Sequence, residues 1–204
     1  MRAFAIVPAA GISSRMGQPK LLLPLNGQPL VLHTLAAWRR SKVDCVVIVV
    51  RPGDDGLANL VRSTGAEVVV PPTPPPDMKA SIQAALRHIE QQHNPIDSDS
   101  FLVAPADMPR LSPAIINRLI QEHGPDSRLI LAPSHQGRHG HPALFPWPFS
   151  AQVLALGDEE GLDHLVRQHE VRLIPCDDLM EDAESAFADI DTPEEYNRLR
   201  TEYQ

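Results

Sequence analysis

Short apolar runs alternate with helical segments along the first half of the chain. The runs at 3–7, 45–50 and 67–70 are largely apolar and rich in β-branched residues, as expected for strands buried on both faces of a sheet. Helices are predicted between them, at about 29–40 and 55–64. Strands that alternate with helices usually form a parallel sheet through right-handed crossovers, so the fold class is α/β.

The second half continues the pattern. It predicts helices at about 78–92, 112–122, 162–168 and 192–203, and strands at 101–104, 129–133, 143–145 and 171–175. The proline-rich segment 71–77 cannot form a helix or strand, because five prolines remove five amide donors. Core segments follow it at once, so we interpret it as an extended loop and predict one domain over residues 1–204. The predicted architecture is a three-layer, doubly wound, mostly parallel, Rossmann-like sheet.

A glycine-bounded loop with two cations follows the first strand. Gly11 and Gly17 allow a sharp turn or a close approach to a ligand, and the amides between them are able to face phosphate oxygens. Arg15 and Lys20 add a forked guanidinium and a compact ammonium, which suit a polyphosphate. The glycine spacing excludes both the P-loop and the dinucleotide-binding fingerprint. A solvated loop with two ordinary glycines remains the alternative.

Asp107 follows the predicted strand 101–104 and would face the same crevice as Gly11, at the carboxyl edge of the sheet. A carboxylate beside phosphates is favourable mainly where a divalent cation bridges them. The alternative is an aspartate that caps a turn between Pro105 and Pro109.

Three further segments carry candidate polar groups. Ser81 offers either a ligand-facing hydroxyl or a local helix cap. The loop 134–143 presents Arg138 and His139, either to an acceptor or simply to solvent. Its three histidines lack a regular element to orient them, so a zinc site is not predicted there. Asp189 and Asp191 are expected to point the same way while Ile190 enters the core, just before a capping box at 192–195.

Charge and cysteine content exclude several classes of protein. Lys plus Arg number 18 against 26 Asp plus Glu, a net charge of −8, which disfavours a nucleic-acid or membrane surface but allows a small anionic ligand. Cys45 and Cys176 show no disulfide or zinc-ribbon pattern and are interpreted as reduced thiols. The chain starts directly in a strand, and no apolar run approaches the ~18 residues of a membrane span. We therefore expect a cytoplasmic protein.

Several motifs together resemble the molybdenum cofactor cytidylyltransferases and guanylyltransferases, which have the nucleoside-diphospho-sugar transferase-like fold. They are Ala9-Ala-Gly-x-Ser-x-Arg-Met-Gly-x-x-Lys20, Asp107-Met-Pro109, Gly140-His-Pro142, Gly157-Asp158 and Asp189-Ile-Asp-Thr-Pro-Glu-Glu-Tyr196. Two departures are Pro8 in the first strand and Asp77 where the family has glycine. The Ala9-Ala10-Gly11 triplet is similar to the cytidylyl branch, which implies a preference for CTP over GTP.

The resemblance implies which residues act. Arg15, Lys20 and Asp107 would be catalytic, and Asp107 and Asp191 would hold Mg²⁺, with Asp189 as the alternative second carboxylate. The implied nucleotide-binding set is Ala9, Ala10, Gly11, Ser13, Arg15, Gly17, Lys20 and Ser81, and the implied acceptor-binding set is Arg138, Gly140 and His141.

The implied reaction is attack by an acceptor phosphate, that of molybdopterin, on the α-phosphorus of the triphosphate, with pyrophosphate leaving. Such transfers need alignment and charge neutralisation more than a protein nucleophile. A guanylyltransferase and a sugar-1-phosphate nucleotidyltransferase remain alternatives. A non-enzymatic, nucleotide-binding accessory module for a partner molybdoenzyme is a third.

Overall fold

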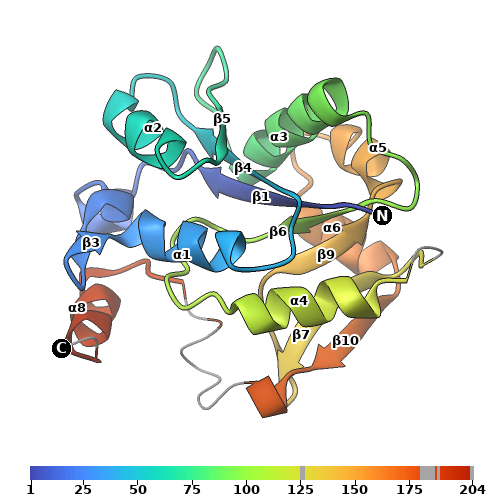
Figure 1. Cartoon of the computed structure of the whole chain (residues 1–204). Coiled ribbons are helices and arrows are strands. Elements are labelled where there is room, and N and C mark those ends of the chain that lie inside the picture. The colour runs from blue at the N-terminus through green and yellow to red at the C-terminus, as the bar shows by residue number, and fades with distance from the viewer. Residues whose placement is uncertain (125–126, 180–186, 188, 203–204) are drawn as a thin grey trace.

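The structure, a computed structural model, describes residues 1–124, 127–179, 187 and 189–202. Within them an eight-stranded sheet has the order β10-β7-β9-β6-β1-β4-β5, with β8 beside β7 (Figure 1). The strands are β1 Ala3–Ala9, β4 Cys45–Val50, β5 Glu67–Val69, β6 Ser100–Val103, β7 Ile130–His135, β8 Arg138–His139, β9 Ala143–Pro146 and β10 Val171–Pro175. A separate hairpin pairs β2 Pro24–Leu25 with β3 Gln28–Pro29.

Helices pack on both faces of the sheet. They are α1 Leu30–Arg39, α2 Asp55–Arg62, α3 Met78–His93, α4 Pro113–Glu122, α5 Phe149–Leu154, α6 Leu162–Gln168 and α8 Pro193–Glu202. One buried cluster joins the sheet to α1, α2, α4 and α8, and a second joins the opposite face to α3, α5 and α6. This arrangement confirms the predicted three-layer α/β fold.

The sheet is mostly parallel. β1 pairs in parallel with both β4 and β6, β4 with β5, and β10 with β7. β9 runs antiparallel between β6 and β7, so its first residue lies near the carboxyl end of β6. That reversal matters for function, because it brings the segment before β9 to the edge of the sheet where the loops after β1 and β6 emerge.

Pro8 lies inside the central strand β1 although it has no amide hydrogen to donate. The ladder between β1 and β6 ends at the Ile6–Val103 pair, two residues before Pro8. The carbonyl of Pro8 still accepts a hydrogen bond from Ala106 N at 3.2 Å. The proline is tolerated because it stands where the neighbouring strand has already ended.

Helix starts follow the local signals. The side chains of Asp54, Asp77 and Ser112 accept hydrogen bonds from backbone amides in the first turns of α2, α3 and α4. In the capping box before α8, Glu195 Oε2 accepts from the amides of Asp191 and Thr192, both at 2.8 Å. This box holds the backbone of Asp191 in a defined position.

The segment 134–143 differs from the predicted irregular loop. β7 continues to His135, and a turn at Gln136 and Gly137, with φ of +47° and +78°, returns the chain as β8. The end of the last predicted helix lies outside the described residues. No described helix is long and apolar enough to cross a membrane.

Asp99 ties the amino end of β1 to the chain entering β6. Its side chain is 1% exposed and accepts hydrogen bonds from the Arg2 amide at 2.6 Å, the Arg2 guanidinium and the Ile96 amide. Burial alone would raise the pKa of Asp99, but these donors outweigh it and lower the pKa.

We expect Asp99→Asn to lower the free energy of unfolding by about 1.5–3 kcal/mol at neutral pH, because hydrogen bonds to a buried charge are lost. The folded pKa lies below the unfolded value of about 3.9, so this stability is present above that pH and disappears as the pH falls through the folded pKa. Urea unfolding at several pH values measures it, with the exposed Asp97→Asn as control. If the two chains still differed by the same free energy of unfolding at the lowest pH, the charge of Asp99 would not be the source of this stability.

Candidate functional site

The strand order changes direction between β1 and β6. From β1 the chain proceeds outward to β4 and β5, then crosses to the other side of β1 to form β6. Ligands bind at such switch points, beyond the carboxyl ends of the strands. A cavity of about 320 Å³ opens there, between the loop after β1 and the loop after β6. Its lining includes Gly11, Ser13, Arg15, Lys20, Asp107 and Asp191, so the structure brings together much of the site expected from the sequence.

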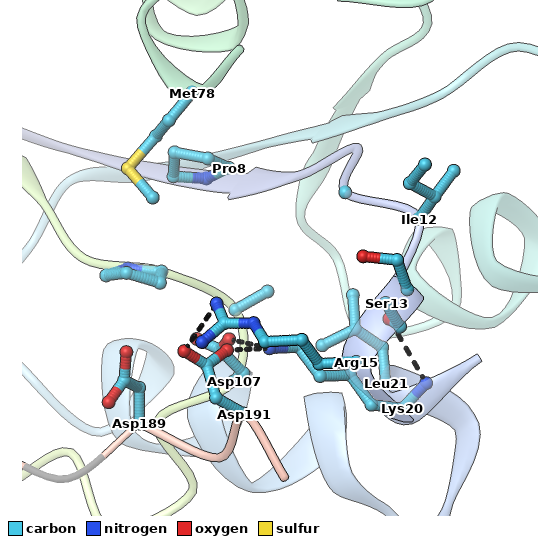
Figure 2. Close-up of a pocket in the computed structure, with 14 residues that line it drawn as sticks. Pro8, Ile12, Ser13, Arg15, Lys20, Leu21, Met78, Asp107, Asp189 and Asp191 are labelled. Carbon is cyan, nitrogen blue, oxygen red and sulfur yellow. Dashed lines mark hydrogen bonds and ion pairs between the residues drawn. The ribbon is translucent and has the colours of Figure 1, made fainter. Parts of the chain in front are cut away.

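Local geometry shapes the loop after β1. Ser13 and Gly17 both have left-handed backbones, with φ of +50° and +65°, on either side of a single 3-10 turn at Ser14–Met16. Met16 is 6% exposed and anchors this turn to the core. The loop is thus held by one buried side chain while its polar side chains face the cavity (Figure 2).

Lys20 lies at the centre of the site. Its Nζ is 2.5 Å from Asp107 Oδ2 and 2.8 Å from Asp191 Oδ1 (Figure 2). It also donates to the carbonyl oxygen of Ile190, at 2.8 Å. These three acceptors account for all three ammonium protons. Lys20 therefore joins the two carboxylates assigned to the metal, and it also fixes the chain segment before α8 to the phosphate loop.

Arg15 reaches the same cluster from the solvent side. Its guanidinium lies 2.7 Å from Asp191 Oδ2, and its side chain is 70% exposed. An exposed ion pair of this kind contributes little stability, so the guanidinium is able to exchange Asp191 for a phosphate oxygen at low cost.

Burial and charge set the pKa values in the cluster. Burial raises the pKa of Asp107 despite the opposing effect of Lys20. Burial would lower the pKa of Lys20, but Asp107 and Asp191 outweigh it and raise the pKa, so the ammonium stays charged. The hydrogen bond from Lys20 lowers the pKa of Asp191.

The carboxylates fit a hard divalent cation. Asp107 Oδ1 is buried and has no hydrogen-bond partner within the described part of the chain. Asp189 lies beside this carboxylate, and its negative charge adds to the increase in the pKa of Asp107. An unsatisfied carboxylate oxygen on a residue that lines the cavity, with a second carboxylate close by, is a donor set that Mg²⁺ or Mn²⁺ uses together with phosphate oxygens.

A second cavity, of about 1050 Å³, adjoins the first and shares Met78 and Asp189 with it. Its polar side includes His139, Gly140 and His141, which the antiparallel course of β9 brings to this edge. Burial lowers the pKa of His141, which favours the neutral imidazole. The floor is apolar and includes Ile82, Val103, Phe145, Leu162 and Val166.

For four expected site residues, the structure shows either a position outside the cavities or a structural role. Ser81 is 2% exposed, and its hydroxyl donates to the Asp77 carbonyl at 3.4 Å, which agrees with the local-cap alternative. Arg138 lies on β8 and lines neither cavity. Gly140 is required by packing, because a Cβ there would overlap the ring of Phe187. Gly17 shapes the turn without lining the cavity.

Ala9 and Ala10 also remain outside the cavity lining, at the end of β1 and just beyond it. His135 points instead to Asp177, at 3.5 Å, and the histidines 135, 139 and 141 form no metal-ligand cluster among the described residues.

Sequence reasoning missed Lys79. Its Nζ donates to the carbonyls of Gly157 at 2.5 Å and Asp158 at 3.0 Å, and so ties the first turn of α3 to the rim of the larger cavity. Its neighbour Met78 separates the two cavities. In the sequence, the only sign of a role for Met78 and Lys79 was their position just after the proline-rich segment. Only the tertiary structure shows that the start of α3 contacts the loop at 157–161.

Comparison with known proteins assigns the chain to a family. Residues 5–173 match the sequence profile of the MobA-like NTP transferase domain. The chain belongs to this family. The match includes Gly11, Lys20, Asp107 and His141, whereas Asp191 lies beyond its end.

Curated relatives of this MobA-like chain divide between two activities. A 2-C-methyl-D-erythritol 4-phosphate cytidylyltransferase from Azoarcus sp. strain BH72 is 39% identical over 59% of the chain and 52% of the relative. A probable molybdenum cofactor guanylyltransferase from Pyrococcus furiosus is 27% identical over 96% of the chain and 95% of the relative. The chain therefore spans about half the length of the cytidylyltransferase that it matches.

Solved structures extend the similarity over the whole fold. Crystalline Rv0371c from Mycobacterium tuberculosis H37Rv superposes with a TM-score of 0.82 at 25% identity, covering 98% of this chain and 99% of that one. A second structure of that protein, described as a complex with manganese, gives a TM-score of 0.75 at 25% identity with the same coverage. The MobA-like assignment thus agrees with the α/β architecture derived from the strand order.

Proposed function

We propose that the chain transfers a nucleotidyl group from a nucleoside triphosphate to a phosphate-bearing small molecule and releases pyrophosphate. CTP is the preferred donor and molybdopterin the acceptor. The observation that carries this proposal is the pair of adjoining cavities, one lined by cations and carboxylates and the other large and apolar-floored, which meet at Met78 and Asp189. Two substrates bound side by side need such an arrangement.

The smaller cavity fits the triphosphate. Arg15 offers an exposed guanidinium, and Lys20 a partly buried ammonium beside the place where charge develops on the leaving pyrophosphate. A divalent cation held by Asp107 and Asp191 supplies Lewis-acid charge to the phosphate oxygens when bound. The manganese complex of the Mycobacterium tuberculosis relative supports this choice. To bind a phosphate oxygen, Lys20 exchanges one of its three present acceptors for it.

The larger cavity fits an acceptor that has a flat ring and a terminal phosphate. Its apolar floor, with Ile82 and Phe145, is suited to a ring system such as a pterin. His141 lies close enough to Asp107 and Asp189 for their charges to act on its pKa, and the acceptor phosphate must lie on that side for in-line attack. The neutral imidazole of His141 is suited to orienting a phosphate oxygen by a hydrogen bond.

Guanylyl transfer is the second candidate. The Pyrococcus furiosus relative, matched over 95% of its length, favours it. The candidates are distinguished by measuring pyrophosphate release in the presence of Mg²⁺. The donor is either CTP or GTP, and the acceptor is either molybdopterin or a sugar 1-phosphate. Nucleotide binding without pyrophosphate release under all these conditions would favour the accessory-module alternative.

We expect kcat/KM for CTP to exceed that for GTP by at least about tenfold, the low end of what pocket size alone provides. The reason is that the Ala9-Ala10-Gly11 triplet, which leads into the cavity at Gly11, resembles that of the cytidylyl branch. Ala10→Gly should reduce the ratio, while Ala151→Gly, an exposed change on α5, should leave it unchanged. A preference for GTP in the unaltered chain would contradict the donor assignment.

A further inference from the structure

A second group of metal-ligating side chains lies at the opposite edge of the sheet. Cys45 begins β4, Glu67 begins β5, and His93 ends α3. One ligand atom from each lies within 4.8 Å of the other two. Parallel strands put their amino ends at the edge away from the candidate active site, so this group, here called the amino-edge cluster, is separate from it.

The distances already approach those around a tetrahedral ion. Cys45 Sγ is 3.8 Å from His93 Nε2, which in turn is 3.1 Å and 3.2 Å from the two Glu67 oxygens. With Zn–S of about 2.3 Å and Zn–N of about 2.0–2.1 Å, tetrahedral geometry puts sulfur and nitrogen about 3.6 Å apart. For the Cys45–His93 and His93–Glu67 pairs, shifts of a few tenths of an ångström separate the present distances from those in a coordination shell.

Supporting contacts orient these ligands. His88 Nε2 lies 2.7 Å from Glu67 Oε2 and so holds the carboxylate, as second-shell groups do at metal sites. The His93 ring also packs against Phe4, with ring centroids 5.3 Å apart. The Arg2 side chain reaches the His93 carbonyl, and its charge is already paired with Asp99. The site is thus restrained and keeps partial access to solvent.

We infer that Cys45, Glu67 and His93 bind a zinc ion. Thiolate, imidazole and carboxylate together select a borderline metal such as Zn²⁺ over Mg²⁺, and three protein ligands leave the fourth tetrahedral position to water. The ion links the starts of two neighbouring strands to the end of α3, which stabilises the fold. This inference does not depend on the proposed function, because none of the three residues lines the candidate active site.

Zinc binds the thiolate form of Cys45, so the thiol proton passes to the buffer as the Zn–S bond forms.

The test is titration of the full, tag-free, metal-free chain with Zn²⁺, followed by a competing chromophoric chelator, and with Co²⁺ as a spectroscopic probe. We expect one tight site and a thiolate-to-cobalt charge-transfer band. Cys45→Ser and His93→Gln should weaken binding by at least about 10²-fold, and His88→Gln by about 10–100-fold, as expected for a supporting group. The matched controls Cys176→Ser and His164→Gln should bind as the unaltered chain does.

Two measurements need no variant at the cluster. Zinc at 100 times its Kd should lower the unfolded fraction about 100-fold, which is measured as a rise in Tm. It should also protect Cys45 from alkylation, which is measured by mass spectrometry. The absence of a thiolate band would overturn the inference. So would binding that persists in Cys45→Ser and disappears in Asp107→Asn, because the ion would then occupy the carboxylates of the other site.

Discussion

Asp107→Asn lowers kcat/KM for pyrophosphate release by about 10³-fold or more, while Tm stays unchanged or rises. The activity falls because a neutral amide no longer holds a divalent cation against the phosphates, and such a cation is worth several kcal/mol at about 1.4 kcal/mol per tenfold in rate. The stability is kept because burial already makes the Asp107 charge costly, as its raised pKa indicates. Lys20 also keeps its contacts with Asp191 and the Ile190 carbonyl, so its ammonium stays paired in the variant.

Steady-state kinetics with a range of Mg²⁺ concentrations, together with thermal melting, measure both effects. Asp97→Asn, an exposed change remote from the cavities, serves as the matched control. Asp191→Asn should be similar or milder, because Lys20 and Arg15 also contact that carboxylate. If Asp189→Asn is severe and Asp191→Asn nearly silent, the second ligand is Asp189. If all three variants keep their activity, the metal assignment is wrong.

Lys20→Met lowers kcat/KM by about 10²–10³-fold, the loss expected when one preorganised transition-state contact is removed. Unlike Asp107→Asn, it also lowers Tm. Lys20 Nζ bonds to Asp107, Asp191 and the Ile190 carbonyl, so its removal leaves two carboxylates facing each other and releases the chain before α8. Added Mg²⁺ should restore more Tm to this variant than to the unaltered chain, because the ion replaces the ammonium between the carboxylates.

Kinetics and melting curves with and without Mg²⁺ check this result, with Lys42→Met as the control for loss of a lysine at an exposed position. A fall in Tm with unchanged kinetics per folded molecule would make Lys20 a structural residue only. If Mg²⁺ changed the Tm of Lys20→Met and of the unaltered chain by the same amount, the ion would not bind between Asp107 and Asp191.

Most of the fold was predictable because its elements carry local signals. The run at 45–50 is apolar and β-branched, and Ser112 with Pro113 starts α4 as predicted. The segment 134–143 was predicted wrongly as an irregular loop. Its β7–β8 hairpin depends on pairing between neighbouring strands, which a single polar sequence does not reveal.

The candidate site was predictable in part for the same reason. Gly11, Arg15, Lys20 and Asp107 stand in the loops that follow two strands, and the strand order brings those loops to one crevice. The amino-edge cluster was not predictable, because Cys45, Glu67 and His93 show no metal-ligand spacing and come from three elements. Of the three residues, the sequence drew attention only to Cys45, which was interpreted, together with Cys176, as a reduced thiol.

The sequence by itself determined the fold class, the course of the chain through its strands and helices, and the chemical types of the residues at the sheet edge. These depend on hydrophobic period, turn residues and caps, which act over a few neighbouring positions. The tertiary structure alone decided that Lys20 joins Asp107 and Asp191, that two cavities meet at Met78, and that Cys45 faces His93. Such contacts join positions far apart in the chain, and packing of the whole sheet and its helices sets their geometry.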